Sequence, residues 1–236
     1  MGAGPDPGPG PGSDGAPVGR RVVLGLLGLG ALGVVTGASV QDGLSKLLAP
    51  VQLRDPTGLT SLVPLGNTWR YYSVTGAVEP RDATTYSLKV AGLVDHPTTY
   101  RLRDLEALPQ LSFTDTFHCV TGWHVPDVPW TGVRLSDLLD RAAPTSKAVG
   151  VRFHSFDGTY SVNMTLDQAR ADDVVVALGM YGKPVTHDHG GPVRIYSGSM
   201  YGYKSTKWLS EIEVTDNNDP GYWEARGYPL DGFIGE

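Results

Sequence analysis

Short apolar runs interrupted by glycine and proline constrain the fold of this chain more than any other feature. Apolar and polar residues alternate over 86–90 and 149–153, which predicts two half-buried strands. The run 174–178 is continuously apolar and short, which predicts a buried strand. Further strands are expected at 111–120, 160–162, 193–196 and 208–214. With 31 glycines and 18 prolines in 236 residues, turns rather than long helices are expected to separate these runs.

A few short helices are expected among the strands. They fall at 44–48, 102–108 and 137–141, and Pro109 and Pro144 are placed to end the second and the third. Ser136 is predicted to cap the third helix. Many strands with a few short helices predict an α+β fold that is dominated by mixed β-sheets.

The first forty residues differ in composition from the remainder. Residues 1–19 are mostly Gly, Pro and Ala, which predicts a disordered tail. Arg20 and Arg21 precede an uncharged stretch that contains five glycines, so we interpret 20–40 as a twin-arginine-like export signal or a membrane anchor. A simple signal anchor would also place the C-terminal domain outside. We therefore expect an exported protein at the extracytoplasmic face of the cytoplasmic membrane, with the segment either cleaved or retained.

Charge and cysteine content narrow the function classes for the rest of the chain. The net charge of −6 argues against broad nucleic-acid binding, which requires a basic surface. Cys119 is the one cysteine, so an internal disulfide is excluded. Residues 41–66 are expected to form a connecting arm, and 67–236 one domain that is large enough to bury a core and a cofactor.

Cys119 ends the expected strand 111–120 and precedes a Gly122-Trp123 turn. A lone cysteine is often a small buried hydrophobe. However, an idle free thiol brings no benefit in an oxidising compartment, and functional side chains concentrate at strand ends and in loops. A thiolate is soft and polarisable, so it suits a redox-active transition metal better than magnesium or calcium. Cys119 is therefore a candidate metal ligand.

A basic, glycine-rich segment follows in the C-terminal third. Between residues 190 and 210 there is no Asp or Glu, whereas Arg194, Lys204 and Lys207 are positive. Glycines at four positions of this segment would let backbone amides approach a ligand closely. Arginine can hold a phosphate through two parallel hydrogen bonds, and lysine adds a point charge. The segment predicts an anion site, with a basic solvated turn as the alternative.

The histidines leave a metal-dependent alternative open. His187 and His189 could bind zinc or copper, with a further ligand from His154 or Cys119. Such pairs are common by chance, and they leave the basic segment unexplained.

Two further alternatives need no metal. Cys119 could form a nucleophile pair with His118 or His124. The chain could also be a catalytically silent, membrane-tethered β-rich binding module.

Four segments together resemble the sulfite-oxidase-fold molybdopterin oxidoreductases, and the resemblance runs from Leu65 to the C-terminus. The similarity is to the small, haem-free branch that includes the catalytic subunit of periplasmic methionine-sulfoxide reductase. The segments are 67–71, the Cys119 block with 128–133, the block 189–207, and the tail 221–228. The third is the most specific, because its spacing from Arg194 is similar to the family's clamp on the cofactor phosphate.

The resemblance implies a molybdenum–molybdopterin cofactor, with Cys119 as the catalytic residue and the protein ligand to molybdenum. The other cofactor-binding residues that it implies are Asn67, Arg70, Tyr71, Ser155, His189, Arg194, Ser205, Thr206 and Lys207. The implied activity is a two-electron oxygen-atom transfer on a small or protein-bound substrate, such as a sulfoxide or another S- or N-oxide. The residues that could line the substrate mouth are His118, Trp123, His124 and Trp130.

Two positions depart from the family pattern. His189 stands where relatives often have Asn, and Thr121 stands where methionine-sulfoxide reductases of this branch tend to have an acidic residue. The substrate therefore does not transfer directly from a relative. We expect a monomer that exchanges electrons with a separate partner, such as a membrane haem or quinone-linked protein, and membrane contact through the N-terminal segment.

Overall fold

The computed structural model describes residues 69–71 and 73–235. The expected tail, export segment and connecting arm, together with Asn67, lie outside the described residues. No helix in the described part is long and apolar enough to cross a membrane.

The first of two sheets has five strands in the order β2-β1-β10-β5-β6. Their bounds are Thr98–Arg101, Ser87–Gly92, Leu209–Thr215, Gly150–Ser155 and Ser161–Thr165. The central pair β1 and β10 is parallel, and the other neighbours are antiparallel, so this sheet is mixed as predicted. Inward-facing side chains of β1, Leu88 and Val90, are fully buried, which explains the alternation in the sequence.

The second sheet is antiparallel and contains β3 (Leu111–His118), β4 (His124–Arg134), β7 (Val174–Met180) and β8 (Lys183–Pro184). These strands follow in chain order, and β9 (Arg194–Ser197) pairs with β7 as well. Five of the seven residues of β7 are buried in one continuous run, in agreement with the predicted buried strand. The β-dominated fold with mixed sheets is confirmed.

Sequence analysis did not predict β4, which contains Pro126 and Pro129. Proline lacks an amide donor, so a strand with two prolines is a poor candidate for the centre of a sheet. The structure resolves this conflict, because β4 pairs with β7 only from Trp130 onward. Both prolines lie in the half of β4 that has β3 as its strand partner, and the β3–β4 register shifts near Asp115.

The helices are short. They are α3 (Leu102–Glu106), α4 (Leu135–Ala142), α5 (Leu166–Ala169) and the 3₁₀ turn η2 (Glu224–Arg226). The prediction that Ser136 caps α4 is wrong, because β4 runs directly into the helix and Arg134 holds the capping position without a side-chain hydrogen bond. The left-handed Ala143 ends α4 one residue before Pro144, as the sequence indicated.

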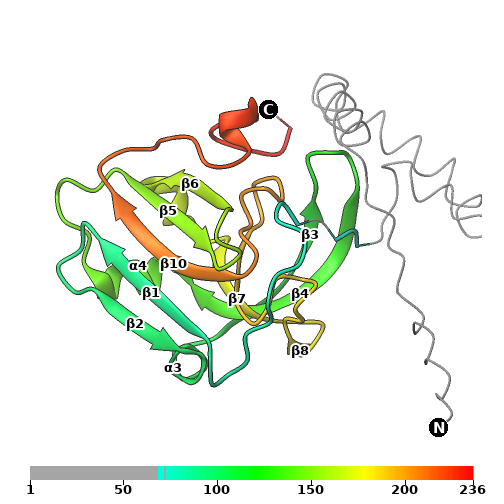
Figure 1. Ribbon diagram of the computed structural model, residues 1–236, viewed down its shortest axis with the longest axis horizontal. Helices are drawn as coiled ribbons and strands as arrows, with labels where there is room; N and C mark the ends of the chain where they lie inside the picture. The colour runs from blue at the N-terminus through cyan, green and yellow to red at the C-terminus, as the bar shows by residue number, and fades with distance from the viewer. Residues whose placement is uncertain (1–68, 72, 236) are drawn as a thin grey trace, which may run out of the picture.

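The main core fills the space between the first sheet, α4 and the inner strands of the second sheet (Figure 1). Its fully buried members include Leu88, Leu139, Val176 and Ile212. A second, aromatic-rich cluster lies under the end of β3 and includes Phe117, Trp123 and Trp130. In Figure 1 the chain leaves β10 and its orange-to-red C-terminal segment returns across the top of the domain, next to β6.

Candidate cofactor site

Cys119 begins the loop that joins β3 to β4. The Cys119 amide donates to the Trp123 carbonyl over 2.9 Å, and the Gly122 amide donates to the Cys119 carbonyl over 3.0 Å. Gly122 has a φ of 98°, which few other residues adopt at low cost. This tight turn holds the Cys119 side chain on the cavity side of the hairpin, partly buried against the aromatic cluster.

The Cys119 Sγ lies 3.2 Å from Thr121 Oγ1. Burial raises the pKa of the thiol, whereas the hydrogen bonds to Thr121 and the charge of Arg70 act to lower it. The thiol of the protein alone is therefore the favoured form, and a bound cation would favour the thiolate.

The basic loop, residues 198–208, joins β9 to β10 and contacts the Cys119 turn directly. The Gly202 amide donates to the His118 carbonyl over 2.7 Å, one residue before the cysteine. A Cβ at position 202 would lie 2.3 Å from Phe117 Cζ, so this approach requires glycine. Cys119 and the basic loop, which are far apart in the sequence, therefore meet at one cavity, and the predicted anion site lies beside the predicted metal ligand.

Arg194, the first residue of β9, is 3% exposed. Its guanidinium donates to the carbonyls of His189 over 2.7 Å, Ser205 over 3.2 Å and Ile195 over 3.3 Å. Burial lowers its pKa to about 10, which leaves it charged at neutral pH. In the described part of the chain no carboxylate forms an ion pair with Arg194; besides the carbonyls, the guanidinium lies 5.5 Å from the centroids of the Phe117 and Trp130 rings, so a buried positive charge lines the cavity.

Lys207 lines the same cavity, and its Nζ lies 4.0 Å from the centroid of the Trp208 ring. Burial and the nearby charge of Arg194 lower the pKa of Lys207 to about 8. Gly190 has a φ of 93°, and a Cβ there would lie 2.4 Å from Lys207 Cβ. Arg194 is buried and Lys207 is half-buried, and their charges act on each other; a phosphate between them would reduce this repulsion, which fits the predicted phosphate clamp.

His189 contacts the segment that precedes β1. Its Nε2 lies 3.1 Å from the Tyr71 hydroxyl, and its ring packs edge-on against Trp69 at a centroid distance of 4.8 Å. Burial and the charges of Arg194 and Lys207 lower the pKa of His189, so the imidazole is neutral at pH 7. Tyr71 and His189 belong to two different segments of the family resemblance, and both were predicted to bind the cofactor. In the structure their side chains are in contact.

The cavity has a volume of about 400 Å³ and contains most of the residues predicted for the site. Those that line it are Arg70, Tyr71, Cys119, His189, Arg194, Ser205 and Lys207. Thr206 is fully buried behind the lining, next to Ser205. Ser155 does not line the cavity; it accepts a hydrogen bond from the Asp157 amide over 3.1 Å at the end of β5.

Sequence analysis missed the aromatic part of the wall. Besides Tyr71, the aromatic residues that line the cavity are Trp69, Phe117, Trp123, Tyr160, Tyr203, Trp208, Tyr222, Trp223 and Tyr228. Of these, Trp123 alone was named as a possible substrate contact. The segment 221–228, one of the four that carry the family resemblance, is rich in aromatic residues, and this composition could have indicated a cavity wall.

His118, His124 and Trp130 do not line the cavity. The two imidazoles stack on each other at a centroid distance of 5.7 Å, and Trp130 is buried against Tyr196. Side chains alternate along a strand, so His118 points away from the face that Phe117 presents to the cavity. The His118 and His124 rings contact each other and the Cys119 sulfur contacts the Thr121 hydroxyl, so these contacts do not support the Cys–His nucleophile pair.

The zinc or copper alternative also lacks a ligand set in the structure. His154 contacts Glu213 at 2.8 Å, and the His187 ring packs against Trp208. Over residues 69–71 and 73–235, no group of three or more His, Cys, Asp or Glu side chains is placed to hold a metal ion.

The donor set fits a phosphate-bearing cofactor whose metal takes one protein sulfur. Arg194 and Lys207 supply positive charge at one side of the cavity, and Cys119 supplies a soft ligand at another. His189 lines the cavity, and its Nδ1 is buried with no hydrogen-bond partner in the described residues, as expected for a group that a ligand completes.

A buried basic loop beside a strand-end cysteine, in a β-dominated fold, defines a domain that binds an anionic redox cofactor. Residues 75–223 match the family model of the oxidoreductase molybdopterin binding domain, and the chain belongs to this family. The domain is an enzyme of the molybdopterin oxidoreductase class, and its cofactor is molybdenum–molybdopterin.

The chain is similar in sequence to two curated relatives and in structure to one solved protein. The uncharacterized oxidoreductase YuiH of Bacillus subtilis (strain 168) is 38% identical over 151 residues, which cover 64% of this chain and 76% of the relative. The protein-methionine-sulfoxide reductase catalytic subunit MsrP of Xanthomonas campestris pv. campestris is 29% identical over 213 residues, which cover 80% of this chain and 63% of the relative.

The sulfane dehydrogenase SoxCD of Paracoccus pantotrophus has a similar structure, with a TM-score of 0.56 and 22% sequence identity. The match covers 60% of this chain and 41% of that chain, and it shows the fold alone. The prediction of a sulfite-oxidase-like molybdopterin-binding fold is confirmed.

Proposed function

We propose that this enzyme reduces sulfoxides of the methionine-sulfoxide type. The observation that carries the proposal is the aromatic wall, in which Trp223 and Tyr228 line the same cavity as Cys119. Aromatic side chains make favourable contacts with sulfur, so such a wall suits a substrate whose reacting atom is a sulfur in an apolar chain. The similarity to a protein-methionine-sulfoxide reductase supports the same substrate class.

The chain's own residues bind and orient the cofactor and exclude water. When bound, molybdenum–molybdopterin supplies a metal that changes by two electrons as an oxygen atom leaves the substrate. Arg194, Ser205 and Lys207 would hold the phosphate end, and Cys119 would bind the metal. Tyr71 and the neutral His189 would hold their hydrogen bond beside the cofactor, where each can donate or accept.

The activity is tested with purified, molybdenum-loaded protein and a chemically reduced viologen dye as electron donor. We expect dye oxidation that depends on added methionine sulfoxide. Sulfite with an electron acceptor is the comparison reaction, because both substrates suit the same cofactor. Loaded protein that oxidises sulfite and leaves every tested sulfoxide unchanged would overturn the proposed substrate class.

We further propose that the protein acts outside the cytoplasm and receives electrons from a separate protein. Arg20, Arg21 and the uncharged stretch that follows support export. The relative's description as a catalytic subunit supports a second subunit as the electron donor. Replacing both arginines by lysine in the native host should retain the protein in the cytoplasmic fraction, and unchanged export would contradict the twin-arginine interpretation.

A further inference from the structure

Lys204 is a fully buried lysine in the basic loop. Its charge was counted in the anion site predicted from the sequence, but Lys204 does not line the cavity. Its side chain is 0% exposed, and its Nζ lies 2.8 Å from Glu224 Oε1, whose side chain is 1% exposed. This is the one ion pair of the described residues in which both partners are buried; the other five involve partly or fully exposed side chains.

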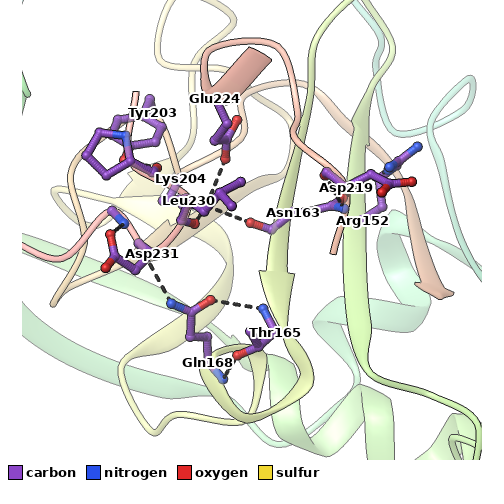
Figure 2. A network of polar contacts seen from close by, with 12 residues as sticks. Arg152, Asn163, Thr165, Gln168, Tyr203, Lys204, Asp219, Glu224, Leu230 and Asp231 are labelled. Atoms are coloured by element: carbon purple, nitrogen blue, oxygen red, sulfur yellow. Dashed lines mark hydrogen bonds and ion pairs between the residues drawn. The ribbon is translucent and has the colours of Figure 1, made fainter. Parts of the chain in front are cut away.

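The Lys204 ammonium joins three segments of the chain, as Figure 2 shows. It donates to the Asn163 carbonyl of β6 over 2.7 Å, to Glu224, and to the Leu230 carbonyl. An ammonium has three N–H groups, so each one has an acceptor. The basic loop, the edge strand β6 and the C-terminal tail, defined as residues 221–235, therefore meet at one atom.

The tail packs closely on this junction. A Cβ at Gly232 would lie 2.8 Å from two carbons of the Lys204 side chain. The Tyr203 hydroxyl donates to the Pro229 carbonyl over 2.7 Å, and the Tyr201 amide donates to the Gly232 carbonyl over 2.8 Å. The tail is therefore tied to the basic loop by hydrogen bonds that surround the buried ion pair.

The same tail supplies part of the cofactor cavity. Tyr222 and Trp223 flank Glu224 on its N-terminal side, and Tyr228 follows two residues before Leu230. All three aromatic side chains line the cavity. Because Ser205 and Lys207 follow Lys204 within three residues, the junction lies between the phosphate side of the cavity and its aromatic wall.

A buried ion pair is rarely the most stable way to fill such a space, since two well-packed apolar side chains often serve stability equally well. Glu224 Oε2 is buried without a hydrogen-bond partner among the described residues, which adds to the cost of the pair. What the fully hydrogen-bonded Lys204 ammonium supplies is direction, because each of its bonds fixes the position of one segment. We propose that Lys204 and Glu224 are positioning residues that hold the C-terminal tail as a wall of the cofactor cavity, and that the cofactor is lost when this link is broken.

Limited proteolysis of the full-length protein tests this proposal. Arg226 is exposed and lies in the tail, with its guanidinium 3.6 Å from the centroid of the Tyr222 ring. Trypsin cleavage after Arg226 releases peptide 227–236, which mass spectrometry detects, so this peptide reports detachment of the tail. Release of oxidised, fluorescent pterin from the loaded protein is the second readout, and neither readout depends on the substrate.

The informative variants are Lys204→Met, Glu224→Gln and the double variant Lys204→Met/Glu224→Met. The double variant leaves no unpaired buried charge, so it folds even if a single variant does not. We expect peptide release and pterin release to rise by about tenfold or more in the double variant, because hydrogen bonds to a charged group are lost. Lys89→Met, which removes an exposed ion pair of the same 2.8 Å length, should change neither rate.

Wild-type rates of peptide and pterin release in the double variant would overturn the proposal. Cleavage throughout the domain, with peptide 227–236 released no faster than the other fragments, would also overturn it, because the pair would then serve global stability alone.

Discussion

Cys119 Sγ and Thr121 Oγ1 lie 3.2 Å apart across the turn that begins β4. Hydrogen bonds to a metal-bound sulfur reduce its electron donation and so tune the metal's potential. Thr121 stands where methionine-sulfoxide reductases resembling this chain tend to have an acidic residue. This contact is therefore a feature of the present sequence that should set the reactivity of its metal.

Replacing Thr121 by Val removes the hydroxyl and keeps the shape of the side chain. We expect the reduction potential of the molybdenum to fall, because the thiolate becomes a stronger donor, and turnover to change by about 10- to 100-fold. An EPR-monitored redox titration measures the potential. Thr121→Ser retains the hydroxyl and should keep the wild-type value; equal potentials in Val and Ser variants would show that the hydrogen bond has no such role.

Gly190→Ala tests whether the turn before β9 positions Lys207. A methyl group at 190 would lie 2.4 Å from Lys207 Cβ, so the lysine must shift from its position in the cavity lining. We expect molybdopterin occupancy to fall several-fold, and unfolding to become easier by about 1–3 kcal/mol. Gly158→Ala is the matched control, since Gly158 also has a positive φ of 78° but has no atom within 4 Å of an added Cβ. Equal occupancy in the two variants would remove the positioning role.

The pKa of about 8 for Lys207 predicts how the cofactor-free protein responds to pH. The folded protein holds this proton less tightly than the unfolded chain, whose lysine titrates near its ordinary value of 10.5. The resulting destabilisation is fully present below pH 8 and is relieved as pH rises from about 8 toward 10.5. The difference in thermal stability between wild type and Lys207→Met should therefore shrink over this range.

Like high pH, added anions should increase the thermal stability of the cofactor-free protein. Phosphate that binds Arg194 and Lys207 stabilises the folded state by mass action, by about 2.7 kcal/mol at a concentration of 100 times its Kd. Thermal unfolding at pH 7 in increasing phosphate, with chloride at equal ionic strength as the control, measures this effect. A phosphate response that persists unchanged in Lys207→Met would place the anion elsewhere.

The sequence placed several candidate residues in one site, because charge, glycine and a single cysteine are visible without a fold. Arg194, Lys207 and Cys119 all line one cavity. It did not predict β4, because Pro126 and Pro129 obscure a strand whose proline-containing half pairs only with β3. It also misplaced the cap of α4, since a strand that runs directly into a helix leaves no separate capping residue at Ser136.

The aromatic composition of 221–228 could have indicated a cavity wall, but its position in the molecule could not be predicted because it depends on long-range contacts. Tyr222 and Trp223 reach the cavity only because the Tyr222 amide donates to the Ser161 carbonyl over 2.7 Å and Glu224 pairs with Lys204. Periodicity reports the face that a segment buries against its neighbours, and it carries no information about a tail without regular secondary structure. Ser155 was predicted to bind the cofactor because it lies near the position of a family contact in the sequence. In the structure Ser155 does not line the cavity, so sequence position alone did not locate it.

The assignment of Cys119 as the protein ligand to molybdenum is tested most directly by counting the sulfur atoms around the metal. X-ray absorption at the molybdenum edge counts the sulfur atoms bound to the metal in the loaded protein. We predict three in the wild type, two from the pterin and one from Cys119, and two in Cys119→Ser, together with loss of turnover. The same sulfur count in both proteins, with pterin present in each, would contradict the assignment of Cys119 as the metal ligand.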